Sequence, residues 1–219
     1  MILFNTGDSH TCYNVDDGHA SNGVWCPKVE DHYWYKIAME DYNCTDFVNE
    51  SRPGRSNDMM IKLVIQHCLE NPTLPTLYII NITTIFRFDL TSPHSYTLHN
   101  ILTPDAISVI NFETIECTLY AKLIGLMEFL KARNKPFLII NNGKNFSDEP
   151  LPMRDSFVQY FKQDSRILNW FDNARIYFQE NVTKIKPVDF NQYGWNGHDG
   201  PEGHRYYYEM LKLRLPKLL

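Results

Sequence analysis

The feature that most constrains the fold of this 219-residue chain is an alternation of short apolar runs with helical patterns. The apolar runs are rich in Ile, Leu, Val and Phe and have the length of buried strands. They cover residues 1–6, 44–48, 77–82, 136–140 and 175–178. Because parallel strands need long crossover connections, this alternation predicts a parallel sheet with helices on both faces. We therefore expect one α/β domain over residues 1–219, built as three α/β/α layers.

One helix is expected before the second apolar run and another after it. Residues 27–41 begin with a proline suited to a first helical turn and repeat apolar side chains every four positions. The members of that pattern are Val29, Tyr33 and Ile37. Ser56 is the expected N-cap of the next helix, which stops at Asn71-Pro72. Its predicted buried stripe consists of Met60, Ile61, Val64, Cys68 and Leu69.

A third helical region is expected over residues 103–134, with a break near Asn111. The residues predicted to face the sheet are Ile115, Leu119, Leu126 and Leu130. Right-handed crossovers put the carboxyl ends of all parallel strands at one edge, where open α/β sheets bind their ligands. Two polar loops, residues 142–153 and 184–199, are expected at that edge.

The charge and cysteine content exclude several classes of function. A net charge of -5 without a basic block is unlike a nucleic-acid binder, so no nucleic-acid partner is expected. The five cysteines are odd in number and widely spaced, and no metal-ligand spacing or phosphate loop occurs, so we expect free thiols, no metal and no cofactor. No apolar run approaches the roughly 20 residues of a membrane span, and residues 1–4 are too short for a signal peptide. These patterns predict a soluble cytoplasmic protein with no membrane partner.

Two short segments near the chain ends carry the candidate chemistry. Gly7-Asp8-Ser9 follows the first strand directly, which places Ser9 in a turn at the ligand-binding edge as a candidate nucleophile. Near the other end, His198 lies in a loop and His204 near the start of a helix led by Pro201. A loop histidine at this edge can reach a hydroxyl from the first strand, so His198 is the candidate base, and His204 is expected to pack against the loop.

These segments resemble the conserved blocks of the SGNH (GDSL-type) hydrolases. Gly7-Asp8-Ser9-His10-Thr11 looks like the first block, and histidine at the position of His10 also occurs in SGNH-type acyltransferases. Gly197-His198 with Gly203-His204 looks like the last block, in which the first histidine is the catalytic base. The resemblance implies a flavodoxin-like five-stranded parallel sheet and a serine esterase. It also implies that the backbone N–H of Ser9 contributes to the oxyanion hole.

A third segment resembles the family's second block, whose glycine amide binds the oxyanion. Pro53-Gly54-Arg55-Ser56-Asn57-Asp58 follows the second strand and opens a helix, and this form is similar to uncharacterised SGNH-like proteins of tailed bacteriophages. Gly54 is therefore the second expected oxyanion donor. The free N–H groups of a helix N-terminus suit the same task.

The chain departs from the family pattern at two polar positions. Where the family has Gly-x-Asn-Asp after the third strand, this chain has Ile80-Asn81-Ile82-Thr83-Thr84, so Asn81, Thr83 or Asn57 is left as the side-chain donor to the oxyanion. The family aspartate before the catalytic histidine is also absent, because Trp195-Asn196 stands there. Asn196 could orient the imidazole of His198; the alternatives are Asp199, Asp189 and a backbone carbonyl.

The resemblance implies removal of an acyl group, commonly acetyl, from a carbohydrate or small ester. His10, Arg87 and Trp195 are the expected substrate contacts, since Arg87 suits an anionic or hydroxyl-rich substrate and loop aromatics are typical of sugar contacts. The alternatives are an SGNH-type O-acyltransferase and a non-catalytic binding or virion protein on the same scaffold. The oligomeric state is not predicted.

Overall fold

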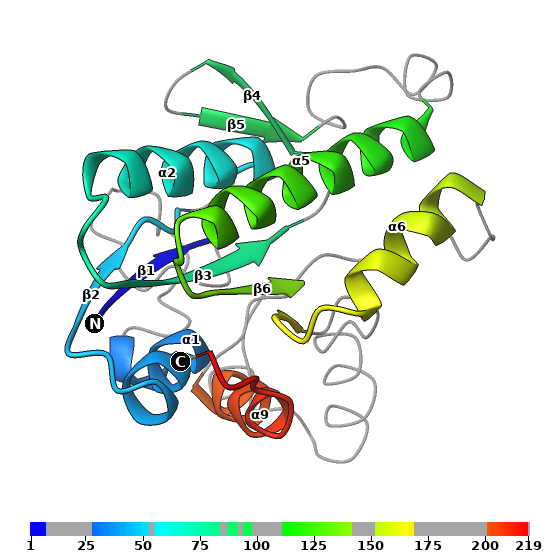
Figure 1. Ribbon diagram of the computed structural model, residues 1–219. Helices are drawn as coiled ribbons and strands as arrows, with labels where there is room; N and C mark the ends of the chain where they lie inside the picture. The colour runs from blue at the N-terminus through cyan, green and yellow to red at the C-terminus, as the bar shows by residue number, and fades with distance from the viewer. Residues whose placement is uncertain are drawn as a thin grey trace.

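The centre of the computed structural model is a five-stranded parallel sheet (Figure 1). The structure describes residues 1–7, 28–52, 55–83, 87–91, 94–97, 111–141, 152–168 and 201–218, and for residues 87–97 the backbone alone. Its strands are β1 (Ile2–Thr6), β2 (Asp46–Asn49), β3 (Thr76–Ile82), β6 (Phe137–Asn141) and β7 (Ile167–Leu168). Their order, β2-β1-β3-β6-β7, is the doubly wound order of flavodoxin-like folds, which confirms the predicted fold class.

The first four predicted strands are found within three residues of their expected bounds, and the fifth differs. The fifth strand of the described sheet is β7, which pairs with β6 through Ile139 and Ile140. With only two residues, β7 is too short to produce a recognisable hydrophobic pattern. The predicted strand at residues 175–178 lies outside the described residues.

Helices cover both faces of the sheet (Figure 1). One face carries η1 (Val29–Asp31), α1 (Tyr33–Lys36), η2 (Ile37–Asp41) and α9 (Pro201–Lys212). The other carries α2 (Asn57–Glu70), α5 (Phe112–Ala132) and α6 (Pro152–Lys162). Because neighbouring strand residues point to opposite faces, Ile79 enters the first core and Ile80 the second.

The helix predicted over residues 27–41 is present as three helical segments that follow one another from Val29 to Asp41.

Local side-chain caps start the two long helices on the second face. The Ser56 hydroxyl accepts a hydrogen bond from the Met59 N–H at 3.2 Å, which confirms the predicted N-cap of α2. The Asn111 carboxamide accepts one from the Thr114 N–H at 3.1 Å, so the expected break near Asn111 is the start of α5. The part of that predicted helix before Asn111 lies outside the described residues.

One member of the predicted α2 stripe is wrong. Leu69 is 56% exposed, whereas the other four side chains of the stripe are buried. At about 100° per residue, Leu69 lies roughly 125° around the helix from the centre of those four. Leu69 directly follows the buried Cys68 in sequence, but one helical step of about 100° turns its side chain toward solvent.

A β-hairpin follows β3 on the side of α2. It consists of β4 (Arg87–Thr91) and β5 (His94–Thr97), which pair antiparallel beside α2 (Figure 1). This hairpin is not among the elements predicted from the sequence. Alternating apolar residues, Phe88 and Leu90, ahead of Ser92-Pro93 are the signal that could have found it.

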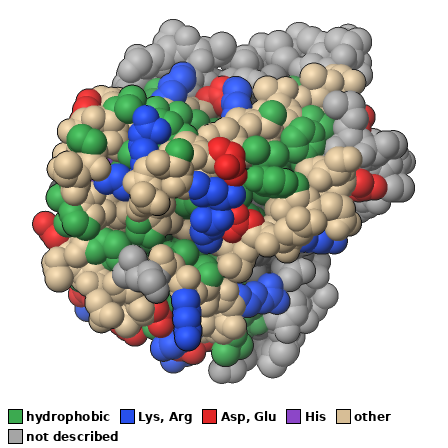
Figure 2. Space-filling model, in the orientation of Figure 1, with side chains coloured by type: hydrophobic (Ala, Val, Ile, Leu, Met, Phe, Trp, Pro, Cys, Tyr) green, Lys and Arg blue, Asp and Glu red, His purple; other side chains and the backbone are tan. Residues whose placement is uncertain are grey.

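The surface drawn in Figure 2 mixes charges of both signs. Among the described residues, Lys122 pairs with Asp58 at 2.7 Å and Lys131 with Glu128 at 2.7 Å. No helix in the described part of the chain is long and apolar enough to cross a membrane. Within the same part, no three His, Cys, Asp or Glu side chains gather in a way that could hold a metal ion.

Candidate functional site

Most of the predicted catalytic and binding residues lie outside the described residues. They are Ser9, His10, Gly54, Trp195, Asn196 and His198, together with the alternative orienting residues Asp189 and Asp199. Arg87 is described only as the first backbone position of β4. The described part of the candidate site consists of the residues that immediately flank these segments and of Asn57, Asn81 and Thr83.

The ends of β1 and β2 are joined by backbone hydrogen bonds. The Glu50 N–H donates to the Asn5 carbonyl at 2.8 Å, and the Arg52 N–H donates to the Gly7 carbonyl at 3.2 Å. Ser9 follows Gly7 by two residues and Gly54 follows Arg52 by two residues, and a two-residue stretch spans at most about 7 Å. The segments that lead to the first two predicted blocks therefore leave the sheet side by side.

A buried row of polar side chains crosses the carboxyl ends of three strands. The Asn81 amide donates to Asn5 Oδ1 at 2.8 Å and to the Thr6 carbonyl at 3.2 Å. The Asn5 amide in turn donates to Asn49 Oδ1 at 2.8 Å and to Ser51 Oγ at 3.0 Å. This row joins β3 to β1 and β1 to β2 at the edge where ligands are expected.

The row begins on a helix. The Tyr33 hydroxyl of α1 donates to Asn81 Oδ1 at 2.6 Å across the first core. We call the set Tyr33, Asn81, Asn5, Asn49 and Ser51 the asparagine network. All of its members except the half-buried Asn49 are buried.

Asn81 is not available as the oxyanion donor that the sequence analysis offered as one alternative. Both hydrogens of its amide are donated to β1, and the side chain is 1% exposed. An amide nitrogen carries only two hydrogens, so none is left for a substrate oxygen in this arrangement. This asparagine, which stands between two isoleucines of β3, forms a structural junction instead.

Asn57 and Thr83 form a second junction at the same edge. The Asn57 Oδ1 accepts from the Thr83 N–H at 2.8 Å, and the Asn57 amide donates to the Thr83 carbonyl at 2.9 Å. These two bonds tie the first residue of α2 to the residue after β3, and both side chains are buried. The side chain of Asn57 therefore binds the backbone of Thr83 through its oxygen and one of its two amide hydrogens.

The first turn of α9 packs against the same region through His204. The His204 ring stacks on the Tyr33 ring at 5.5 Å and lies 4.2 Å from the His32 ring, measured between centroids. His204 is buried against the start of α1. The loop against which it was expected to pack lies outside the described residues. His198 precedes Pro201, the first residue of α9, by three positions. The helix that follows the candidate base is thus anchored beside the asparagine network.

Tyr33, Asn5 and Ser51 were not singled out as site residues by the sequence analysis. The available signal was polarity at apolar positions, because Asn5 and Asn81 interrupt strands whose other central residues are apolar. A buried amide must find hydrogen-bond partners, so such a residue indicates a polar junction at that point. Tyr33 gave no comparable signal, since a buried tyrosine in a helical stripe is ordinary core packing.

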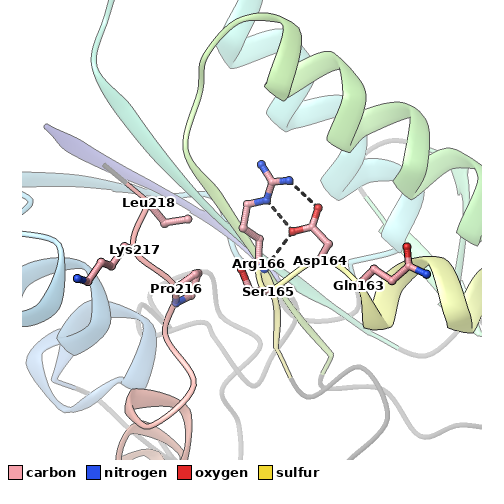
Figure 3. A pocket seen from close by; sticks show the side chains of 7 residues that line it. All are labelled: Gln163, Asp164, Ser165, Arg166, Pro216, Lys217 and Leu218. Carbon is pink, nitrogen blue, oxygen red and sulfur yellow. Dashed lines mark hydrogen bonds and ion pairs between the residues drawn. The ribbon is translucent and has the colours of Figure 1, made fainter.

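A cavity of about 350 Å³ lies elsewhere on the molecule (Figure 3). It is lined by residues 163–166, just before β7, and by residues 216–218 of the C-terminal tail. The guanidinium of Arg166 is held there by the carboxylate of Asp164 at 2.6 and 2.7 Å. Because this cavity is at the amino end of β7, it is opposite the edge that carries the candidate site.

Comparisons with known proteins give fold likeness at low identity. No family model matches the chain, and no curated protein matches it in sequence. A catalytic mutant of Axe2, an acetylxylan esterase from Geobacillus stearothermophilus, has a TM-score of 0.50 at 18% identity, with 100% of this chain and 95% of that chain covered. TesA has a TM-score of 0.52 at 15% identity, with 100% of both chains covered. A structure described as a GDSL-like lipase from Parabacteroides merdae has a TM-score of 0.50 at 15% identity, with coverages of 97% and 94%. These likenesses show that the chain has the fold of SGNH hydrolases.

Proposed function

We propose that this protein is a serine esterase that removes an acyl group, commonly acetyl, from a carbohydrate or another small ester. Ser9 is the nucleophile, and His198 takes its proton and returns it to the leaving alcohol. Asn196 orients the imidazole of His198 in place of the family aspartate. His10, Arg87 and Trp195 contact the substrate.

The oxyanion that forms on the ester carbonyl is held by three donors in this proposal. They are the backbone N–H groups of Ser9 and Gly54 and one side-chain donor, either the hydroxyl of Thr83 or the amide of Asn57. The pairing of Thr83 with Asn57 supports this role, because two hydrogen bonds hold the Thr83 backbone at the edge of the sheet. Donors fixed before the reaction cost no reorganisation when the negative charge develops.

The observation that carries the proposal is the convergence of the flanking segments. Gly7 directly follows β1, Arg52 lies three residues after β2, and Thr83 directly follows β3. The first turn of α9 is anchored beside these strands through His204. These flanks precede or follow the residues that the family pattern assigns to catalysis. The acetylxylan esterase named above has the same fold, which supports the choice of an acetyl ester. The relation to bacteriophage proteins stays a prediction from residues 53–58.

The test uses short-chain p-nitrophenyl esters and a fluorophosphonate probe. We expect hydrolysis of the acetate ester and labelling of Ser9, and we expect Ser9→Ala to abolish both. Ser165→Ala is a matched control, because this serine lines the cavity at the opposite edge. Activity that survives Ser9→Ala would refute the assignment. A chain inert toward both reagents would favour the non-catalytic alternative, and acyl transfer is distinguished by product analysis with an added sugar acceptor.

Asn196 is tested by replacement with aspartate and with alanine. A neutral carboxamide orients imidazole but does not stabilise imidazolium by charge, so Asn196→Asp should maintain or raise kcat, whereas Asn196→Ala should lower it. Equal activity of all three forms would instead favour one of the alternatives, namely Asp199, Asp189 or a backbone carbonyl.

A further inference from the structure

We infer that the asparagine network is a positioning device for the esterase centre, and that the Tyr33 hydroxyl acts as a positioning residue through Asn81. This inference rests on the proposed function. It assigns a role to Tyr33, Asn5, Asn49 and Ser51, which the family resemblance does not include, and a new role to Asn81.

The network touches each of the segments that lead to a proposed catalytic residue. It holds the end of β1 through Asn5 and the Thr6 carbonyl, three residues before Ser9. It holds the segment after β2 through Ser51, three residues before Gly54. Asn81 lies in β3, two residues before Thr83.

The fourth contact is made by the Tyr33 ring. It stacks on His204, the fourth residue of α9, at 5.5 Å with an interplanar angle of 23°. The Tyr207 ring, about one turn further along α9, forms a T-shaped pair with the Tyr33 ring at 5.9 Å between centroids. Tyr33 therefore contacts both β3 and the helix that follows His198.

The donor and the acceptor of each hydrogen bond in the network are fixed by backbone groups that can only accept or only donate. The Thr6 carbonyl can only accept, so the amide nitrogen of Asn81 must face β1 and its oxygen must face Tyr33. Tyr33 is therefore the donor of that bond.

The same logic holds at the other end of the row. Asn49 Oδ1 accepts from the Ser51 N–H at 3.1 Å, which turns the Asn49 oxygen toward the Asn5 amide. Loss of the Tyr33 hydroxyl leaves a buried acceptor unpaired and removes one of the three hydrogen bonds that hold the Asn81 side chain.

Such a loss should affect catalysis more than substrate binding. Hydrolysis requires the nucleophile, base and oxyanion donors to be aligned at once, and a misplacement of about 1 Å can cost about 100-fold in rate. We expect Tyr33→Phe to lower kcat for the acetate ester at least about 10-fold while KM changes less than about threefold. The rate of fluorophosphonate labelling at Ser9 should fall by a similar factor.

Tyr78→Phe is the matched control. Tyr78 is also a fully buried tyrosine whose hydroxyl contacts a side chain, His67 Nδ1 at 3.0 Å, but it lies in the second core. Each substitution removes one buried hydroxyl and keeps the ring. A general loss of stability should therefore affect both variants, whereas a loss of positioning should affect only Tyr33→Phe.

The outcomes separate this inference from the proposed function. If wild-type protein is labelled at Ser9 and the two tyrosine variants have equal kcat, the positioning role is overturned and the esterase proposal stands. If wild-type protein is inert toward ester and probe, both fail. If Tyr33→Phe does not fold, Ser51→Ala decides, because it removes an acceptor at the other end of the network. Its kcat should fall with KM preserved, and an unchanged kcat would overturn the inference.

Discussion

At the scale of single residues, Lys135 shows how one buried charge can close a turn. Its side chain donates to the Leu74 carbonyl at 2.8 Å and to the Asn71 carbonyl at 3.4 Å, between the end of α2 and the start of β3. Carbonyls after a helix lack intrahelical partners, and hydrogen bonds from a charged donor are stronger than neutral ones. The lysine thus stabilises the turn before the central strand.

Replacing Lys135 with methionine should lower the free energy of unfolding by about 1–3 kcal/mol, because two half-buried carbonyls lose a charged donor and keep only the neutral donors Leu74 N–H and Thr76 Oγ1. The control is Lys122→Met, since Lys122 forms an exposed ion pair with Asp58 and its loss should cost under about 1 kcal/mol. Urea unfolding measures both. Equal losses in the two variants would show that burial gives the Lys135 contacts no additional strength.

His67 makes the second residue-scale prediction. Burial lowers the pKa of His67 below its ordinary 6.5, while Glu70 and Glu50 raise it and Lys135 lowers it. A lowered pKa in the folded state means that the neutral ring is favoured, so this contribution to stability is present above about pH 6.5 and is lost as the pH falls through the folded pKa.

The free energy of unfolding of wild-type protein should therefore fall more steeply between about pH 7.5 and about pH 5 than that of His67→Gln. Glutamine keeps a polar group near the Tyr78 hydroxyl but does not titrate. The difference between the two pH profiles isolates His67 from the other histidines. Parallel profiles would contradict the prediction.

At the scale of elements, the caps of α2 and α5 are comparable in geometry and differ in location. Ser56 is buried and follows the proposed Gly54 donor by two residues in sequence, whereas Asn111 is exposed at the start of α5. Removing either cap leaves an unpaired backbone N–H in the first helical turn.

Ser56→Ala and Asn111→Ala should each lower the free energy of unfolding by about 1 kcal/mol. Ser56→Ala should in addition reduce esterase activity, because the start of α2 carries Asn57 and follows the proposed Gly54 oxyanion donor. Denaturant unfolding together with acetate hydrolysis tests this difference. A loss of activity in both variants would indicate a global effect rather than a local one.

The elements were predictable where their signal is local. The N-cap of α2 follows from Ser56 and the helix behind it, and four strands follow from apolar runs. β7 was not predicted because two residues are too few to show an alternating hydrophobic pattern. The role of Asn81 was missed because its partner Tyr33 is 48 positions away, and only the fold brings the two together. Sequence patterns thus indicate elements, whereas junctions between elements depend on the tertiary arrangement.

At the scale of the whole molecule, one sheet separates two apolar cores. Trp34, Tyr207 and Leu138 belong to the first core, and Val64 and Ile139 belong to the second. The asparagine network lies on the first face, and the Asn57 to Thr83 junction joins the second face to the same edge. The proposed site therefore depends on both layers, and it should be lost whenever either layer unfolds.

Two neighbouring residues of β6 test whether the layers unfold together. Leu138 and Ile139 are both fully buried and enter opposite cores, so Leu138→Ala and Ile139→Ala should each cost about 2–5 kcal/mol. If the sheet couples the cores, both variants should shift one transition, with equal midpoints by far-UV circular dichroism and by tryptophan fluorescence, to which the buried Trp34 contributes. A fluorescence midpoint that moves in Leu138→Ala ahead of the circular dichroism midpoint would show that the layer of α1 and α9 can unfold alone. Esterase activity would then follow the fluorescence transition, because that layer carries Tyr33 and the helix after His198.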